Sequence, residues 1–242
     1  MVNYKKNFLI TSTGTGLGKT YVCCQIIKGM LEKKVNAMPL KPILSGYSKK
    51  LHFDSDSAKL LRSAGKNYDL NSVKEITPWL FKKPIAPTLA AKIENKKLSY
   101  KKLKRWCSEK VSHNNRNKKV TFIEGAGGLM VPIGQRNTFL NLAKELNLSI
   151  ILVVGSYLGS VSHTLSILKN IEQANLKIVT LIINQVPEVI NQPLNDTKEL
   201  ISNNSLQKIK VRKINKNSNF KNSNMKLIIK DIINYLKNLI LA

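Results

Sequence analysis

A glycine-rich stretch near the start of the chain has the residue types of a phosphate-binding loop. It reads FLITSTGTGLGKTYVCCQII and closes on Gly-Lys-Thr. The common pattern is Gly, four residues of any type, then Gly-Lys-Ser/Thr. The glycines free backbone N–H groups to face an anion, the lysine reaches the β- and γ-phosphates, and the threonine hydroxyl contacts Mg²⁺. We therefore expect ATP to bind along Thr13, Gly14, Thr15, Gly16, Leu17, Gly18, Lys19 and Thr20.

Carboxylates that could complete a magnesium site are few, because the chain has only 14 acidic residues. In nucleotide sites Mg²⁺ takes one or two protein carboxylates. Glu124 ends the apolar stretch VTFIE and precedes Gly-Ala-Gly-Gly. This context predicts a carboxylate at the sheet edge where ligands of open α/β folds bind, with capping of local N–H groups as the alternative. Asp54 and Asp56, in HFDSDSAKLL, stand at a predicted helix start, where they could equally cap the helix.

Short apolar segments alternate with amphipathic segments of helix length. The alternation predicts an α/β fold, P-loop NTPase-like, with a mostly parallel sheet and helices on both faces. The length favours one domain, residues 1–242. Strands are expected at Asn7–Thr11, Val35–Leu40, Val120–Glu124, Ser149–Val154, Ile178–Ile183 and Lys208–Ile214. Helices are expected at Lys19–Glu32, Asp56–Ala64, Ala86–Ile93, Tyr100–Ser112, Thr138–Glu145, Val161–Ala174 and Met225–Leu239. The stretches NQPLNDTKELISNN and NKNSNFKNSN are interpreted as surface connections.

Composition narrows the cellular context and the partners. Without an export signal or a membrane-length apolar run, a cytoplasmic protein is expected. Its three cysteines, an odd count with two of them adjacent, favour reduced thiols. A net charge of +26 would attract nucleic acid or anionic membranes. Because the lysines are spread along the chain among Asn and Ile, we favour a compositional bias and expect neither partner. Likewise, we expect the cationic C-terminal helix to dock on the sheet rather than lie on a membrane.

Several stretches, taken together and in order, match one known family. They are TSTGTGLGKT, LKPILSGY, DSDSAKLL, ITPWLFKKPIAPTLAA, FIEGAGGLMVPI, ILVVGSYLGSVSHTLSIL and LIINQV. By these motifs the chain resembles the dethiobiotin synthetase family, the ATP-dependent ring-closing ligases of biotin biosynthesis. That family's loop is one residue longer and opens with glycine, where Ser12 stands here. Because Ser lacks glycine's freedom at positive φ, we expect a less tight turn that still binds nucleotide.

The resemblance implies a homodimer that converts 7,8-diaminononanoate (7,8-diaminopelargonate), CO₂ and ATP, with Mg²⁺, to dethiobiotin, ADP and phosphate. It implies Lys41 and Lys19 as catalytic residues. It further implies a metal site at Thr20, Asp56 and Glu124, and an adenine contact at Asn184. The implied substrate contacts are Lys41, Ser45, Gly125, Ala126, Gly127 and Gly128, with Gly159, Ser160, Val161 and Ser162 contributed by the neighbouring subunit.

Departures near the adenine end suggest a looser nucleotide preference than strict use of ATP. Gln185 replaces a frequent Asp, and Arg212-Lys213-Ile214-Asn215 replaces a Gly-Glu-Ile/Leu-Pro turn. The alternative function is a partitioning or cell-division ATPase that binds DNA or membrane. That group carries a signature lysine at the position of Gly14, which argues against it. A cobyrinate-amidating ATPase is a nearer alternative, but no glutaminase domain accompanies the chain.

Overall fold

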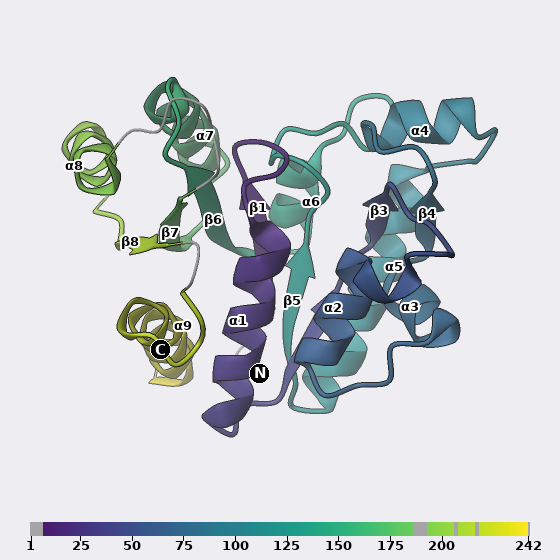
Figure 1. The fold of residues 1–242 in the computed structure, drawn as a ribbon, viewed down its shortest axis with the longest axis horizontal. Coiled ribbons are helices and arrows are strands. Elements are labelled where there is room, and N and C mark those ends of the chain that lie inside the picture. Colours follow the sequence, from purple (N-terminus) through teal and green to yellow (C-terminus); the bar gives the residue numbers. More distant parts are fainter. Residues whose placement is uncertain (1–6, 186–192, 206–207, 216–217, 242) are drawn as a thin grey trace.

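Six parallel strands form the main sheet in the computed structural model, which describes residues 7–185, 193–205, 208–215 and 218–241. Their order is β2-β5-β1-β6-β7-β8. The bounds are β1 Asn7–Ser12, β2 Ala37–Leu40, β5 Val120–Glu124, β6 Ser149–Gly155, β7 Ile178–Asn184 and β8 Val211–Ile214. β1 lies near the centre, and the chain passes first to one side of it and then to the other (Figure 1). Such a reversal of strand order places a crevice at the carboxyl ends of the strands.

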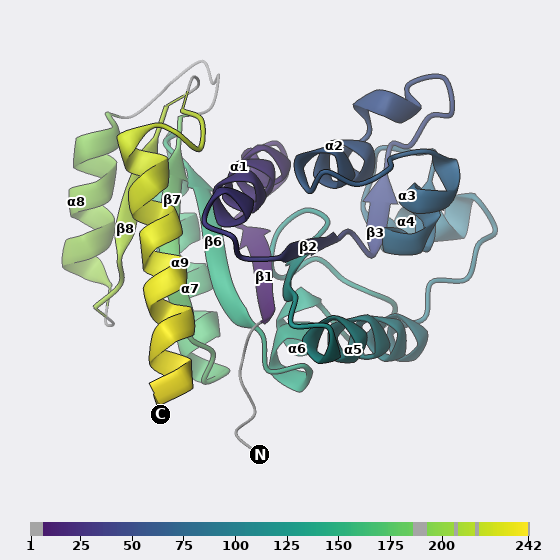
Figure 2. The same cartoon turned by 90° about the horizontal axis from the view of Figure 1, so that it is seen from below.

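Helices cover both faces of this sheet. Figure 2 shows α1 and α2 on one side of β1 and β2, with α5 and α6 on the other. The bounds are α1 Lys19–Glu32, α2 Asp56–Ser63, α5 Tyr100–Arg116, α6 Phe139–Glu145 and α7 Ser160–Gln173. β1, β5, β6 and β7 have no exposed residue. Full burial matches their nearly continuous apolar sequences, and the α/β prediction is confirmed.

The C-terminal helix α9, Ser223–Leu241, docks on the protein as expected. Ile228, Ile229 and Ile232 are buried in the core that α9 shares with α1. The Arg212 guanidinium donates to both carboxylate oxygens of Asp231, at 2.7 and 3.0 Å, and so ties β8 to α9. Arg212, noted as a departure near the predicted adenine site, is therefore committed to a structural ion pair.

A smaller sheet lies beside the main one and was not predicted. It pairs β3, Ile43–Ser45, with β4, Trp79–Phe81, in parallel. Figure 1 shows two further helices near it, α3 Leu70–Ile76 and α4 Pro87–Ile93, and the chain between β3 and α2 forms the short helix η1, His52–Asp54. Of these, only α4 was expected. The small sheet matters for the site because β3 carries Ser45.

One connection proves to be a helix. Residues 191–204 were interpreted as a surface connection, whereas α8 spans Leu194–Asn204. Only Thr197 and Ile201 are buried along it, so the apolar periodicity that would reveal a helix is weak. In the described part of the second stretch, residues 215 and 218–224, the chain turns until α9 begins at Ser223. Across the described residues, no helix combines the length and apolar character needed to cross a membrane.

Candidate active site

A cavity of about 660 Å³ lies where β1, β2 and β5 end. It is bordered by the phosphate loop, the small sheet and the loop before α4. Eleven of the residues that line it were predicted from the sequence as site residues: Thr15, Gly16, Gly18, Lys19, Thr20, Lys41, Ser45, Asp56, Glu124, Ala126 and Gly127. Segments that are far apart in the sequence thus meet in one cavity, as expected for the crevice of a parallel sheet.

The phosphate loop joins β1 to α1 without a strained non-glycine residue. The positive φ angles within it belong to Gly16 (76°) and Gly18 (85°), and Ser12 lies in β1. The expected loss of tightness at Ser12 is therefore wrong, because the left-handed positions fall at the two glycines. A Cβ on Gly18 would lie 2.3 Å from the Asn184 amide nitrogen, so glycine is also needed there for space.

Lys19 is buried and folds back into its own loop. Its ammonium group donates to Ser12 Oγ and to the Gly14 carbonyl oxygen, each at 3.0 Å. Burial, and secondarily the charge of Lys41, lowers the pKa of Lys19 to about 8. A cation that is costly to keep charged here favours an incoming phosphate group.

Lys41 lies between two carboxylates. Its ammonium group is 2.5 Å from Glu124 Oε1 and 3.4 Å from Asp56 Oδ2, and it also donates to the Gly125 carbonyl oxygen. Burial lowers the pKa of Lys41, but the two carboxylates more than offset that effect, so the pKa lies above its ordinary value. Lys41 is therefore a cation at neutral pH and not a free base.

The residues predicted for the metal converge on one corner of the cavity. Thr20 donates to Glu124 Oε1 at 2.7 Å, while Asp56 reaches the same Lys41 ammonium. Glu124 Oε2 is buried and has no hydrogen-bond partner. An unsatisfied buried carboxylate oxygen is costly and is suited to a cation. These oxygen donors fit Mg²⁺, which binds one or two carboxylates together with nucleotide phosphates.

Ser45 faces the cavity from the end of β3. Its hydroxyl is buried without a hydrogen-bond partner, so it is free for a ligand. The next two residues are anchored, because the Gly46 amide donates to the Lys83 carbonyl and the Tyr47 amide to the Phe81 carbonyl. The Tyr47 hydroxyl also lies 2.9 Å from His52 Nδ1. β4 and η1 thus hold Ser45 in place.

In the glycine-rich loop after Glu124, some residues line the cavity and others pack against the protein. Ala126 and Gly127 line the cavity. Gly128 packs instead against the phosphate loop, since a Cβ there would lie 3.2 Å from the Ser12 carbonyl oxygen. The need for glycine at 128 therefore comes from contact within the protein.

Several predicted residues are not among the described residues that line this cavity. Thr13, Gly14, Leu17 and Gly125 are absent from the lining although nearby residues of the same loops belong to it, and two further groups lie elsewhere. Asn184 ends β7, and its amide donates to the Leu17 carbonyl at 3.1 Å. The start of α7 is formed by Gly159, Ser160, Val161 and Ser162, none of which lines the cavity. Figure 1 shows α7 beside β6, across β1 from the small sheet. One copy of the chain does not bring this helix start to its own cavity.

Sequence reasoning missed one wall of the cavity. The remaining lining residues are Ile43, Leu44, Pro84, Ile85, Ala86, Pro87 and Val131. The paired prolines in KKPIAPT mark a rigid turn, but apolar lining residues have no distinctive spacing. They supply the mostly apolar surface that is usual in small-molecule sites.

Known proteins carry the same sequence pattern. A family described as an AAA domain matches residues 6–222. The ATP-dependent dethiobiotin synthetase BioD of Acidiphilium cryptum is 32% identical over 80% of this chain and 85% of its own length. That of Akkermansia muciniphila is 34% identical over 76% and 80%. The chain belongs to the dethiobiotin synthetase family. The predicted family is thereby confirmed, and with it the class of enzyme, an ATP-dependent ligase of biotin biosynthesis.

Solved structures agree on the fold of this synthetase. The MinC:MinD cell division complex of Aquifex aeolicus aligns with a TM-score of 0.53 at 13% identity, over 98% of this chain and 96% of that one. The signal recognition particle receptor FtsY of Elizabethkingia anophelis aligns with a TM-score of 0.51 at 9% identity, over 97% of this chain and 66% of the receptor. At such low identity the likeness shows a shared P-loop NTPase-like architecture and nothing about partners.

Proposed function

We propose that the chain joins 7,8-diaminononanoate, CO₂ and ATP to give dethiobiotin, ADP and phosphate. The observation that carries the proposal is the convergence of Lys19, Lys41 and Glu124 on a single cavity beside the phosphate loop. Two cations there can accept two anionic reactants, and the cavity has room for both. The 242 residues would form one domain that carries the whole reaction.

The reaction needs three bond-forming steps. One amine attacks CO₂ and loses a proton, giving a carbamate. A carbamate oxygen attacks the γ-phosphorus as the bond to ADP breaks, giving a mixed anhydride. The second amine then attacks the anhydride carbonyl, phosphate leaves, and the ureido ring closes. The second step brings two anions together, so positioning and neutralisation of charge should dominate catalysis.

The two lysines divide that work. Lys19, at the phosphate loop, would bind the phosphate chain. Lys41 is placed by Glu124 and Asp56 and remains protonated, so it would hold the carbamate by charge rather than remove a proton. Ser45, with its unpaired hydroxyl, would contact the reacting end of the diamine, and Ala126 and Gly127 would line its path.

A magnesium ion would be held by Thr20, Asp56 and Glu124 together with the nucleotide phosphates. The ion would supply positive charge at the γ-phosphate oxygens. Its fit is supported by the unpartnered Glu124 Oε2. Because Glu124 Oε1 is already bonded to Thr20 and Lys41, the free oxygen is the one available to a cation.

The carboxylate at the far end of the substrate would be bound by the start of α7 from a second copy of the chain. Gly159 caps α7 at φ 91° with no side-chain cap. The Ser160 amide donates to the Tyr157 carbonyl at 3.0 Å, whereas the next two amides, of Val161 and Ser162, are open to an anion. Leu158 beside it is 65% exposed, a large apolar residue that a second copy would cover. The synthetase would therefore be a homodimer with shared sites.

For the adenine, Asn184 remains the proposed contact. One of its two amide N–H groups donates to the Leu17 carbonyl, which leaves the other N–H to donate to the base and the amide oxygen to accept from it. The loose nucleotide preference is proposed from the departures at Gln185 and at Arg212-Lys213-Ile214-Asn215. Comparable turnover with ATP, GTP and CTP is expected, and a large preference for ATP would contradict it.

The test of the function is direct. Purified protein is incubated with 7,8-diaminononanoate, MgATP and ¹³C-bicarbonate, and the product is followed by mass spectrometry. We expect dethiobiotin with one ¹³C atom, formed with one ADP per product. Product that appears without nucleotide, or no ring closure by a folded protein that binds MgATP, would overturn the proposal.

A further inference from the structure

Ser12 places a buried hydroxyl group at the centre of the phosphate loop. The residue ends β1 and is fully buried. Its Oγ accepts from the Lys19 ammonium group at 3.0 Å and from the Gly14 amide at 3.3 Å. The hydroxyl proton lies within reach of two carbonyl oxygens, on Gly14 and on Gly127. One side chain thus contacts both loops that border the nucleotide end of the cavity.

Hydrogen bonds within the loop use two of the three ammonium protons of Lys19. A lysine ammonium group has three protons and no acceptor. Two are donated within the loop, to Ser12 Oγ and to the Gly14 carbonyl. No described residue accepts the third, and Lys19 lines the cavity. Two fixed donations determine where the remaining proton points, whereas one would leave the group free to rotate.

We propose that Ser12 is a positioning residue for Lys19: its hydroxyl fixes the ammonium group so that the free proton meets the phosphate chain of the nucleotide. The inference deepens the proposed function, on which it rests, because it concerns the nucleotide half of the same cavity. A glycine at this position has no hydroxyl to offer. In this chain, therefore, a serine supplies an orientation that the loop backbone alone would not.

A competing role for Ser12 is purely structural, through its contact with Gly127. The two roles separate by which ligand is affected. If Ser12 positions Lys19, its loss should weaken binding of the nucleotide and leave binding of the diamine unchanged. If Ser12 only holds the Gly127 loop, its loss should weaken binding of both. The variants are Ser12→Ala, which removes only the hydroxyl, Ser12→Gly, and Ser12→Thr, which keeps the hydroxyl.

The experiment measures binding of AMP-PNP with Mg²⁺ by calorimetry, together with the KM of each substrate. Ser12→Ala and Ser12→Gly should weaken AMP-PNP about tenfold, which corresponds to about 1.4 kcal/mol. The KM for ATP should rise in parallel, while the KM for 7,8-diaminononanoate stays within about twofold. Ser12→Thr should restore binding to within about twofold, because the hydroxyl is what matters.

The matched control is Ser149→Ala. Ser149 is a buried serine in β6, next to β1, and its hydroxyl is bonded to Tyr235 at 2.7 Å away from the loop. This variant should lose stability in urea and keep the parent's nucleotide affinity. If Ser12→Thr is itself unstable in urea, the Ala and Gly variants decide alone.

Two results would overturn the inference. One is parent-like AMP-PNP affinity in Ser12→Ala or Ser12→Gly, and the other is an equal rise in the KM of both substrates. Failure of the proposed function would look different: the parent would bind AMP-PNP in a Ser12-dependent manner but make no dethiobiotin.

Discussion

At the scale of single residues, Lys41 is the group whose loss should be most damaging. It is the buried cation between Glu124 and Asp56. Lys41→Met should lower kcat by about 10³-fold, because a preorganised charge at the developing anion is lost. Steady-state formation of dethiobiotin measures the effect, and exposed Lys92→Met on α4 is the control. Since Glu124 would lose its cation, Lys41→Met/Glu124→Gln serves as a second variant, and parent-like kcat in either would refute the role.

Lys19 should make nucleotide binding depend on pH. Its pKa of about 8 means that it is protonated below that pH and loses its charge as the pH rises through 8. Affinity for Mg-AMP-PNP should therefore be level below about pH 7, fall about twofold by pH 8 and fall about tenfold from pH 8.5 to 9.5. Calorimetry across pH 6.5–9.5 measures this. Lys19→Arg keeps its charge and should show no such fall; a level profile in the parent would contradict the prediction.

At the scale of elements, α1 and α9 approach closely at Gly29. A Cβ on Gly29 would lie 2.0 Å from Ile229 Cδ1 and 2.9 Å from its Cγ1. Gly29→Ala should therefore destabilise the protein by about 1–2 kcal/mol, even though alanine favours the helix by about 1 kcal/mol. Urea unfolding measures this. In an Ile229→Ala background the penalty should vanish, and an unchanged penalty there would show that the two helices do not meet at this point.

The elements also show where sequence reasoning succeeds and where it stops. The buried strands and α1 were predictable because their apolar runs and glycine turn are local signals. β3 and β4 have three residues each, too few to show a period, and they exist because each pairs with the other. α8 has two buried residues and so lacks an apolar face. In the site, charged and glycine residues were predictable, whereas the role of Ser12 depends on Lys19 folding back onto it.

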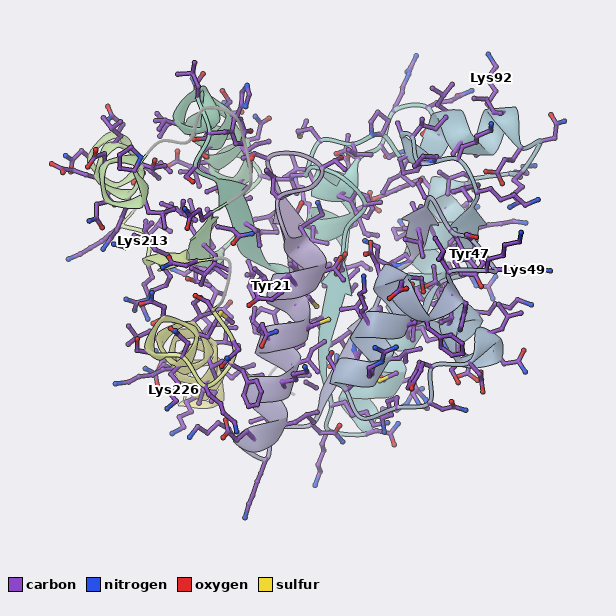
Figure 3. The ribbon with its side chains drawn as sticks, in the orientation of Figure 1. Tyr21, Tyr47, Lys49, Lys92, Lys213 and Lys226 are labelled. Atoms are coloured by element: carbon purple, nitrogen blue, oxygen red, sulfur yellow. The ribbon has the colours of Figure 1, made fainter. Side chains whose placement is uncertain are left out.

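At the scale of the whole molecule, lysines far apart in the sequence lie at opposite ends of the protein. Figure 3 places Lys49 and Lys92 at one end of the protein and Lys213 and Lys226 at the other. They come from the loop after β3, from α4, from β8 and from α9. A nucleic-acid footprint requires a basic stripe or patch. The scattered arrangement supports the compositional interpretation of the +26 charge.

The proposed shared site gives a prediction for the assembly. Ser162 is an exposed residue in the first turn of α7. Ser162→Asp suits the helix dipole but repels the substrate carboxylate, so the KM for 7,8-diaminononanoate should rise at least about tenfold without loss of stability. Ser162→Asn is the uncharged control. Kinetics and thermal unfolding measure both effects.

Mixing variants then tests whether two copies share a site. In the proposed shared site, Lys41 comes from one copy of the chain and Ser162 from the other, so Ser162→Asp and Lys41→Met damage different parts of the same site. A random mixture of dimers should regain about a quarter of the parent activity at low substrate, because half the dimers are hybrids with one intact site. No recovery after exchange of subunits would indicate that each copy works alone.

The buried cysteines have a practical consequence. Cys23 and Cys107 are fully enclosed, one in α1 and one in α5, on opposite faces of the sheet, and burial raises the pKa of both thiols. An alkylating reagent can therefore modify them only when the surrounding layers separate. The rate at which each cysteine is alkylated would therefore measure how often the layer around it opens, without any engineered label. Slower alkylation in the presence of nucleotide would report ligand binding, even in crude extract.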